Sequence, residues 1–448
     1  MPLISDRDPT KPFGKLKLSE EETKFSKRGP CDRVFVYWDV SKHCPLPPAC
    51  RIRYLLAYIN QSLGKLDEKL FVEHVTFVGD SDSVTDIQIK EIHNNFQMTW
   101  KEACDRDPVC DSCKKPDSEY EGKKAESADA VMVRELMGHA YDYPAPGYVM
   151  VISADSNFSR AMRFMGKRGF KVLLAHHLKS RPNFHTYADF SWLFPGIIDG
   201  EGPKYDRNGR LPDDFSPISL GFQIPIPRAE REFGLINPDP SERNSEIPGF
   251  WDVENTPLPQ GYLIEELIPK INLALSKFNN GHNRLKLSRL NVVGSDAVHV
   301  LSESRRQTLV SSGPQFGCQV HVETPDRRKR ICSSCQTPYN SPSQQTYQDD
   351  FSRVIDVADF LLTEKLMEYL VNFRTPGFVL LISGDKDFGP TLAFLRKRGF
   401  KIILAQPSIK KATTTELHSE AHLGWKFEDL LEGKEPVWFT EVFPKYDW

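Results

Sequence analysis

Two stretches of the chain repeat one pattern of hydrophobic and polar positions. In residues 378–405, five apolar residues precede a polar corner at 383–387, a helix-like segment with Pro390 in its first turn, and a second apolar run. A short continuous apolar run is typical of a strand buried on both faces in a parallel sheet. Residues 148–175 repeat the pattern 230 positions earlier (385 − 155 = 230). The pattern therefore predicts an internal duplication of one α/β unit.

The repeat extends toward the N-terminus in both copies. The apolar runs VFVYWD and GFWD end at Asp39 and Asp252, which are 213 positions apart (252 − 39 = 213). Residues 128–140 and 357–370 have apolar residues at helical spacing and an aspartate in the first turn. Alternation of strands and helices predicts two α/β domains in tandem, each built on a doubly wound parallel sheet.

The same pattern divides the chain into five segments. We expect a flexible N-terminal tail over 1–30, a first domain over 31–199, a proline-rich linker over 200–245, a second domain over 246–431 and an aromatic tail over 432–448. Recurrent prolines argue against regular structure in the linker. The aromatic tail is expected to cover an exposed sheet edge.

The composition indicates a soluble globular protein without a global nucleic-acid footprint. The 448 residues carry a net charge of −3, and 39% of them are hydrophobic. Nucleic-acid binding would therefore depend on local basic patches. No apolar run has the length of a membrane span, and the N-terminal segment lacks the apolar region of a secretory signal. Nine cysteines without such a signal point to a reducing compartment, so we expect a cytoplasmic or nuclear protein.

Each copy places aspartates where a parallel sheet would bring them together. Clustered carboxylates repel one another, and a hard divalent cation relieves this repulsion by accepting oxygen ligands. Mg²⁺ or Mn²⁺ held in this way activates water and stabilises charge on a phosphodiester. One such aspartate alone is more simply a solvated loop residue or helix cap, but the repeated set favours metal-dependent phosphodiester hydrolysis. The candidates are Asp252, Asp359, Asp385 and Asp387 in the second copy, and Asp39, Asp129, Asp155 and Asn157 in the first.

Three segments of the second copy, WDVENTPLPQG, DVADFLLTEKL and LLISGDKDFGPTLAFLRKRGFKIILAQP, resemble the NYN domain, a PIN-like nuclease fold. They are most similar to the limkain-b group, also called meiosis regulator and mRNA stability factor. The resemblance implies a Rossmann-like α/β/α sandwich for each of the two domains. It also implies an endoribonuclease that cleaves single-stranded RNA with Mg²⁺ or Mn²⁺ and regulates gene expression at the RNA level. Such proteins are commonly associated with peroxisomes, whereas this chain ends in Tyr446-Asp447-Trp448 rather than a peroxisomal address.

By this resemblance the four aspartates of the second copy are metal ligands, Asn255 positions the substrate or a metal-bound water, and Glu254 supports the ligands. The first copy departs from the pattern, because Asn157 replaces the fourth aspartate and residues 41–42 are Ser-Lys. An amide and an ammonium both weaken cation binding. The first copy is therefore either active or a degenerate domain kept for packing or RNA binding. For the whole chain, the alternative is a non-catalytic RNA-binding or adaptor protein with vestigial nuclease domains.

The two copies also carry paired cysteines at equivalent places. A C-x-x-C pair is half of a zinc site, so four thiolates could bind one Zn²⁺ that joins the domains. Unligated thiols in surface loops are the alternative. A basic run before the second pair could bind the RNA backbone, act as a nuclear-localisation signal, or simply be solvated. The residues are Cys110, Cys113, Cys332 and Cys335 for zinc, and Arg327, Arg328, Lys329 and Arg330 for the basic run.

Overall fold

The computed structural model describes most of both predicted domains. The described residues are 32–40, 44–48, 50–103, 128–178, 180, 183–212, 246–277, 285–294, 301–323, 357–373, 377–407, 415–436 and 438–439. The predicted tail over 1–30, Lys42, the four cysteines proposed for zinc and the basic run over 327–330 lie outside these ranges. Within them, no helix has the length and apolar character needed to cross a membrane.

The first sheet has the strand order β3-β2-β1-β4-β5-β6-β7-β8. Strands β1 to β6 pair in parallel, and β7 and β8 add an antiparallel edge. The chain order reverses between β1 and β4, which makes the edge above this pair the place where doubly wound folds bind ligands. The strands are β1 (Arg33–Asp39), β2 (Phe71–Gly79), β3 (Met98–Glu102), β4 (Tyr148–Ile152), β5 (Lys171–His176), β6 (Phe190–Leu193), β7 (Tyr205–Asp206) and β8 (Gly209–Arg210).

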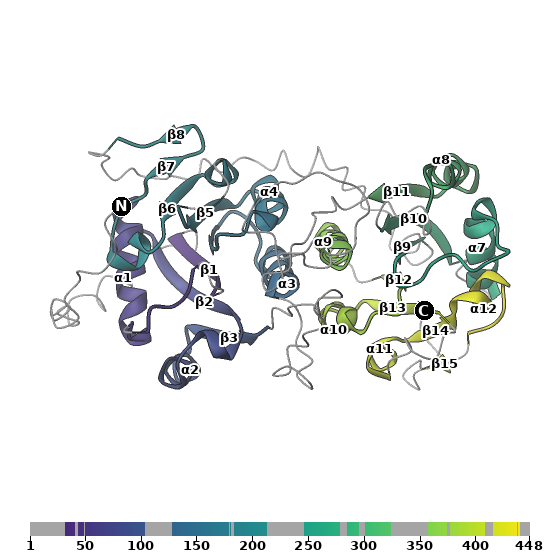
Figure 1. Ribbon diagram of the computed structural model, residues 1–448, viewed down its shortest axis with the longest axis horizontal. Coiled ribbons are helices and arrows are strands. Elements are labelled where there is room, and N and C mark those ends of the chain that lie inside the picture. The colour runs from purple at the N-terminus through teal and green to yellow at the C-terminus, as the bar shows by residue number, and fades with distance from the viewer. Residues whose placement is uncertain are drawn as a thin grey trace, which may run out of the picture.

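The second sheet repeats this topology with the order β11-β10-β9-β12-β13-β14-β15 (Figure 1). Its reversal lies between β9 and β12, which pair in parallel like β1 and β4. The predicted fold class, two α/β domains in tandem, is confirmed. The strands are β9 (Glu246–Asp252), β10 (Lys286–Val293), β11 (Gln319–Glu323), β12 (Phe378–Ile382), β13 (Lys401–Gln406), β14 (Leu423–Lys426) and β15 (Trp438–Phe439).

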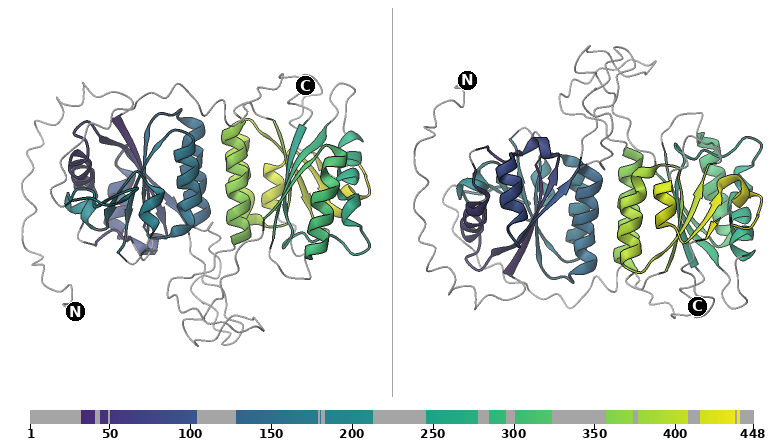
Figure 2. Two further views of the ribbon diagram at one scale, coloured as in Figure 1. Left: turned by 90° about the horizontal axis from the view of Figure 1, so that it is seen from above. Right: turned by 90° about the horizontal axis from the view of Figure 1, so that it is seen from below.

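Helices cover both faces of each sheet (Figure 2). In β4, Val149 and Val151 share a core with α3, whereas Met150 and Ile152 share one with α1, because successive side chains of a strand point to opposite faces. The helices are α1 (Ile52–Gly64), α2 (Asp86–His93), α3 (Ala128–Asp142) and α4 (Ser159–Lys167) in the first domain, and α7 (Leu267–Lys277), α8 (Glu303–Ser312), α9 (Val357–Asn372), α10 (Gly389–Lys397), α11 (Thr415–Glu420) and α12 (Phe427–Leu431) in the second.

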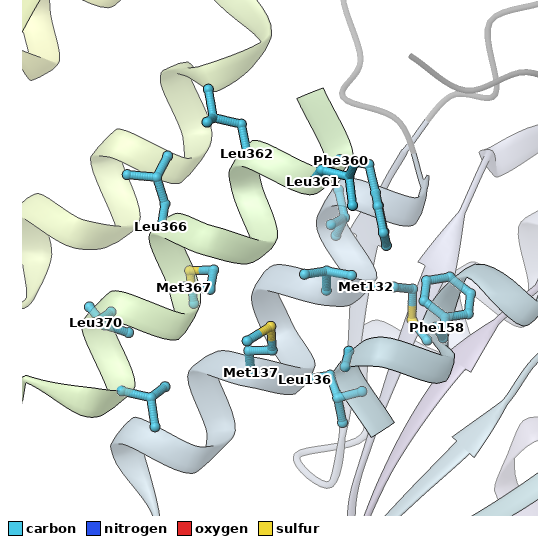
Figure 3. Packing of buried hydrophobic residues seen from close by; sticks show 14 of the residues in the cluster. Met132, Leu136, Met137, Phe158, Phe360, Leu361, Leu362, Leu366, Met367 and Leu370 are labelled. Atoms are coloured by element: carbon cyan, nitrogen blue, oxygen red, sulfur yellow. The ribbon is translucent and has the colours of Figure 1, made fainter. Parts of the chain in front are cut away.

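Helices α3 and α9 pack against each other and join the two domains through one continuous core (Figure 2). Both helices are apolar around most of their circumference, as expected for helices covered on all sides. Met137 and Met367 point toward one another across the contact (Figure 3), and they are equivalent residues of the repeat (367 − 137 = 230). The domains therefore meet through the same surface of each copy, as subunits do around a twofold axis.

At one edge of each sheet, strands come from residues outside the two predicted domains. Strands β7 and β8 place residues 205–210 in the first sheet, so the linker predicted over 200–245 begins too early. Antiparallel pairing there satisfies backbone groups that an edge strand would leave exposed. Trp438 and Phe439, from the predicted aromatic tail, pair with β14 at the edge of the second sheet.

Candidate functional site

The corner after β12 is fixed by a buried serine that the sequence analysis did not select. The Ser383 hydroxyl donates a hydrogen bond to Oδ2 of Asp252 at 2.8 Å and accepts one from the backbone N–H of Asp385 at 3.0 Å. The side chain of Asp385 in turn accepts from the N–H of Asp387 at 2.9 Å and caps the 3₁₀ turn η10 (Lys386–Phe388). Ser383 is fully buried, and its two hydrogen bonds link the corner to the end of β9.

Asn255 brings the carboxylates of Asp252 and Asp385 together. Its amide Nδ2 donates to Oδ2 of Asp252 at 2.8 Å and to Oδ2 of Asp385 at 3.3 Å. The loop that carries Asn255 is anchored by Trp251, whose indole N–H donates to the carbonyl of Thr256 at 2.7 Å. Asp252 is 1% exposed, so its charge depends on these donors and on whatever cation the site accepts.

The other two predicted ligands lie on elements that adjoin this pair. Asp359 is in the first turn of α9, which packs against β9 and η10, and Asp387 is within η10. In the parts of the chain that the structure describes, however, no three side chains of His, Cys, Asp or Glu are grouped closely enough to hold a metal ion. The structure thus brings Asp252 and Asp385 together, while the four-carboxylate cluster is not shown.

The first domain builds the same corner with nearly the same distances. Ser153 donates to Oδ2 of Asp39 at 2.8 Å and accepts from the N–H of Asp155 at 3.0 Å. The side chain of Asp155 accepts from the N–H of Asn157 at 2.8 Å. Ser153 and Ser383 are 230 positions apart (383 − 153 = 230) and identical, and this identity between the copies is the sequence signal that would have identified them.

The first domain differs in which carboxylates are joined. The amide Nδ2 of Asn157 lies 3.4 Å from Oδ2 of Asp129 and 3.3 Å from Oδ2 of Asp155, so it donates to the helix carboxylate and to the corner carboxylate. A hydrogen-bond donor thus faces both oxygens, where a cation would bind. In the second domain this position is Asp387, which contributes oxygen acceptors only.

The donor chemistry of the second domain fits a hard cation. Asp252, Asp359, Asp385 and Asp387 offer only oxygen, and the Asn255 side chain adds an amide oxygen to this set. Mg²⁺ and Mn²⁺ prefer such ligands. The first domain fits a cation less well, because Asn157 has a neutral amide where the second domain has the carboxylate of Asp387, so one negatively charged ligand is missing.

Comparison with known proteins identifies the family. The NYN domain model matches residues 33–191 and 249–423. No curated protein matches the chain. Among solved structures, a protein of unknown function from Vibrio parahaemolyticus is 15% identical over 42% of this chain and 96% of its own, with a TM-score of 0.24. UDP-GlcNAc 2-epimerase from Neisseria meningitidis is 9% identical over 89% of this chain and 90% of its own, also with a TM-score of 0.24.

These structural similarities are too weak to carry an argument about fold or function. The two family matches, by contrast, cover most of the chain and fall on the two copies of one α/β fold. The protein therefore belongs to the NYN domain family, whose domains are generally nucleases.

Proposed function

We propose that the protein is a metal-dependent endoribonuclease that cleaves single-stranded RNA, with the reaction carried out by the second domain. The observation that carries the proposal is the Asp252–Asn255–Asp385 group, located where β9 and β12 reverse the chain order of the sheet. Family membership supports nuclease chemistry on RNA, and the carboxylates support metal dependence.

The metal would be held by Asp252, Asp385, Asp359 and Asp387. When bound, Mg²⁺ or Mn²⁺ supplies a polarised phosphodiester and a water of lowered pKa. Ser383 fixes the orientation of Asp252 by donating to its Oδ2. The Asn255 amide bridges two carboxylates and keeps the strand end and the corner at one spacing. Preorganisation of these two carboxylates reduces the rearrangement required when the metal and the substrate bind.

The remaining features of the proposal concern substrate and place. The first domain serves packing or RNA binding rather than cleavage, since Asn157 takes the position of the fourth aspartate. Membership of the limkain-b group, a role in RNA-level regulation and a cytoplasmic location belong to the same proposal and rest on the sequence alone. The cysteine pairs remain a proposal for zinc.

The test is cleavage of an end-labelled single-stranded RNA by the purified full-length protein in Mg²⁺, Mn²⁺ or EDTA. We expect cleavage with either metal and none with EDTA. Asp385→Asn should abolish cleavage, because it removes a metal ligand from the domain that carries out the reaction. The matched variant Asp155→Asn removes one charge from the equivalent corner of the first domain and should leave cleavage unchanged within about threefold. Cleavage that survives EDTA, or that Asp385→Asn does not diminish, would reject the proposal.

The non-catalytic alternative is favoured by one observation, the amide of Asn157 between two carboxylates in the first domain. If this arrangement represents the function of both domains, the protein should bind RNA without cleaving it. Binding to the same labelled RNA by wild-type protein in EDTA, together with no cleavage in Mn²⁺, would support the alternative.

A further inference from the structure

The contact between the domains is symmetric at the end remote from the candidate sites. Arg168 follows α4 and its guanidinium lies 3.4 Å from Oδ1 of Asn372, at the end of α9. Arg398 follows α10 and its Nε lies 3.1 Å from Oδ1 of Asp142, at the end of α3. Both members of these pairs are related by the repeat (398 − 168 = 230; 372 − 142 = 230). Each domain thus gives one arginine to the other.

The contact is not symmetric at the end that carries the sites. Arg160 lies in the first turn of α4, immediately after the corner of the first domain, and its Nη1 donates to Glu323 at the carboxyl end of β11. Its Nε also lies 3.1 Å from Oε2 of Glu364 in α9, an ion pair without hydrogen-bond geometry. The residue equivalent to Arg160 is Pro390 (160 + 230 = 390), which has no charge to return. At this end, Arg160 thus links the first domain to the second, and Pro390 cannot form the equivalent ion pair in the opposite direction.

The partner of Arg160 lies on the helix that carries a predicted ligand. Glu364 follows Asp359 by five residues, which rotates it by about 140° around the helix and moves it about 7.5 Å along the axis. Asp359 and Glu364 therefore lie on largely opposite sides of α9. A force on Glu364 reaches Asp359 through the backbone of one helical segment rather than by direct contact.

Glu364 is a buried carboxylate, and its ion pair with Arg160 compensates its negative charge. The side chain of Glu364 is 6% exposed. Burial raises its pKa to about 7, while Arg160 and Lys365 oppose this rise and Glu323 and Glu368 add to it. A carboxylate that is buried among other carboxylates depends strongly on its cationic partner.

We propose that Arg160 is a positioning residue for the site of the second domain. The first domain, whose own metal ligands are incomplete, uses Arg160 to hold the N-terminal half of α9 against the end of β11, and so keeps Asp359 in place. This inference rests on the proposed function, but hydrogen exchange and Mn²⁺ binding can test it without measuring RNA cleavage. It assigns the first domain the role of a built-in activating subunit.

The test compares Arg160→Met with Arg168→Met in the full-length protein. Both variants remove one arginine from α4 or its end that contacts α9, but only the first removes the contact at the site end. We measure amide hydrogen exchange over 357–363, Mn²⁺ affinity by titration calorimetry, and kcat and KM on single-stranded RNA. In Arg160→Met, exchange should accelerate and Mn²⁺ affinity should fall, each by roughly tenfold, as when an outer partner of a metal ligand is removed. Arg168→Met should stay within about threefold of wild type in each measurement.

A double-mutant cycle guards against misfolding of Arg160→Met. Glu364→Gln removes the buried charge without leaving an uncompensated one, so it should fold, and it should also weaken Mn²⁺ binding. The double variant should bind Mn²⁺ no more weakly than Arg160→Met, because the two residues act through one contact. Additive losses, or equal effects of Arg160→Met and Arg168→Met, would overturn the inference. If the wild type cleaves no RNA, the proposed function fails, while exchange and Mn²⁺ binding still decide the inference.

Discussion

The two domains use an asparagine amide to join carboxylates, but they join different ones. In the first domain, Asn157 connects the corner to Asp129 on α3. In the second, Asn255 connects the corner to Asp252 at the end of β9, and position 387 is an aspartate. An amide can offset repulsion between carboxylates without any ion, whereas a fourth carboxylate increases the need for one. Under the proposed function, the same corner forms a packed structural site in the first domain and a cation site in the second.

The domains also differ in what they give to their shared contact. The two domains contribute equivalent residues to the core between α3 and α9, since equivalent methionines meet in it. The charged groups at the end of the contact near the candidate sites are not equivalent, because Arg160 has no counterpart in the second domain. We therefore expect the two domains to unfold together in one transition, and only the second domain to cleave RNA.

The largest expected effect concerns cleavage. Asp252→Asn should reduce kcat on single-stranded RNA by roughly a hundredfold or more, because a lost metal ligand removes several kcal/mol of transition-state stabilisation. Asp39→Asn changes the equivalent strand end of the first domain and should leave kcat within about threefold. The measurement is turnover of both variants on one RNA at saturating Mn²⁺. Equal losses would show that the two sites share the reaction.

The next effect concerns the common core. Met137→Ala and Met367→Ala should each lower the free energy of unfolding by about 2–5 kcal/mol, as expected for a buried methionine. Both should shift one cooperative transition in calorimetry, because α3 and α9 belong to the same core. Two transitions, with each variant shifting only its own, would show that the domains unfold separately. In that case an isolated second domain (246–448) should be stable and active, which the shared core argues against.

A third difference lies at equivalent positions of the two central helices. Position 139 is histidine in α3 and position 369 is tyrosine in α9. Burial lowers the pKa of His139 to about 4. The unfolded chain binds a proton below about pH 6.5 that the folded state excludes, so stability is fully present above that pH and falls as the pH drops toward 4.

The slope attributable to His139 is at most about 1.4 kcal/mol per pH unit. Urea unfolding at pH 7 and pH 5 should show a smaller loss for His139→Tyr than for the wild type. His422, whose pKa burial lowers to about 4, remains in both proteins, so the difference between them reports on His139. An unchanged pH dependence in the variant would contradict this expectation.

The smallest effect concerns two helical glycines. A Cβ at Gly138 would lie 2.3 Å from the Phe394 ring of the other domain, whereas a Cβ at Gly166 would meet nothing within 4 Å. Gly138→Ala should therefore destabilise the protein by about 1–3 kcal/mol through overpacking. Gly166→Ala should stabilise it by roughly 0.5–1 kcal/mol, since alanine loses less conformational freedom in a helix. Thermal unfolding of both variants measures the difference, and a stabilising Gly138→Ala would show that the ring moves aside.

The fold class, and the positions of the candidate residues at strand ends, could be predicted from local patterns. Apolar runs that end on aspartate indicated where β1 and β9 stop, and the repeat spacing indicated which residues of the two domains are equivalent. These features depend on neighbours in the chain, because a run of apolar residues specifies that a strand is buried whatever covers it. Ser383 was missed because a serine in a corner has many simpler explanations than a link to a strand 131 residues away.

Only the tertiary structure determined which surfaces the apolar helix faces pack against and which residues the charged groups pair with. In α3, Met132 and Leu136 are among the apolar residues at helical spacing that the sequence shows, but the same helix is also apolar on the side of Met137. An apolar face indicates burial without saying against what. Likewise, the sequence shows that positions 157 and 255 are asparagines, but only the folded chain shows which carboxylates their amides join. Arg160 meets Glu364 because two domains pack around a shared core, and contacts between residues so far apart in the chain depend on the whole fold rather than on any local pattern.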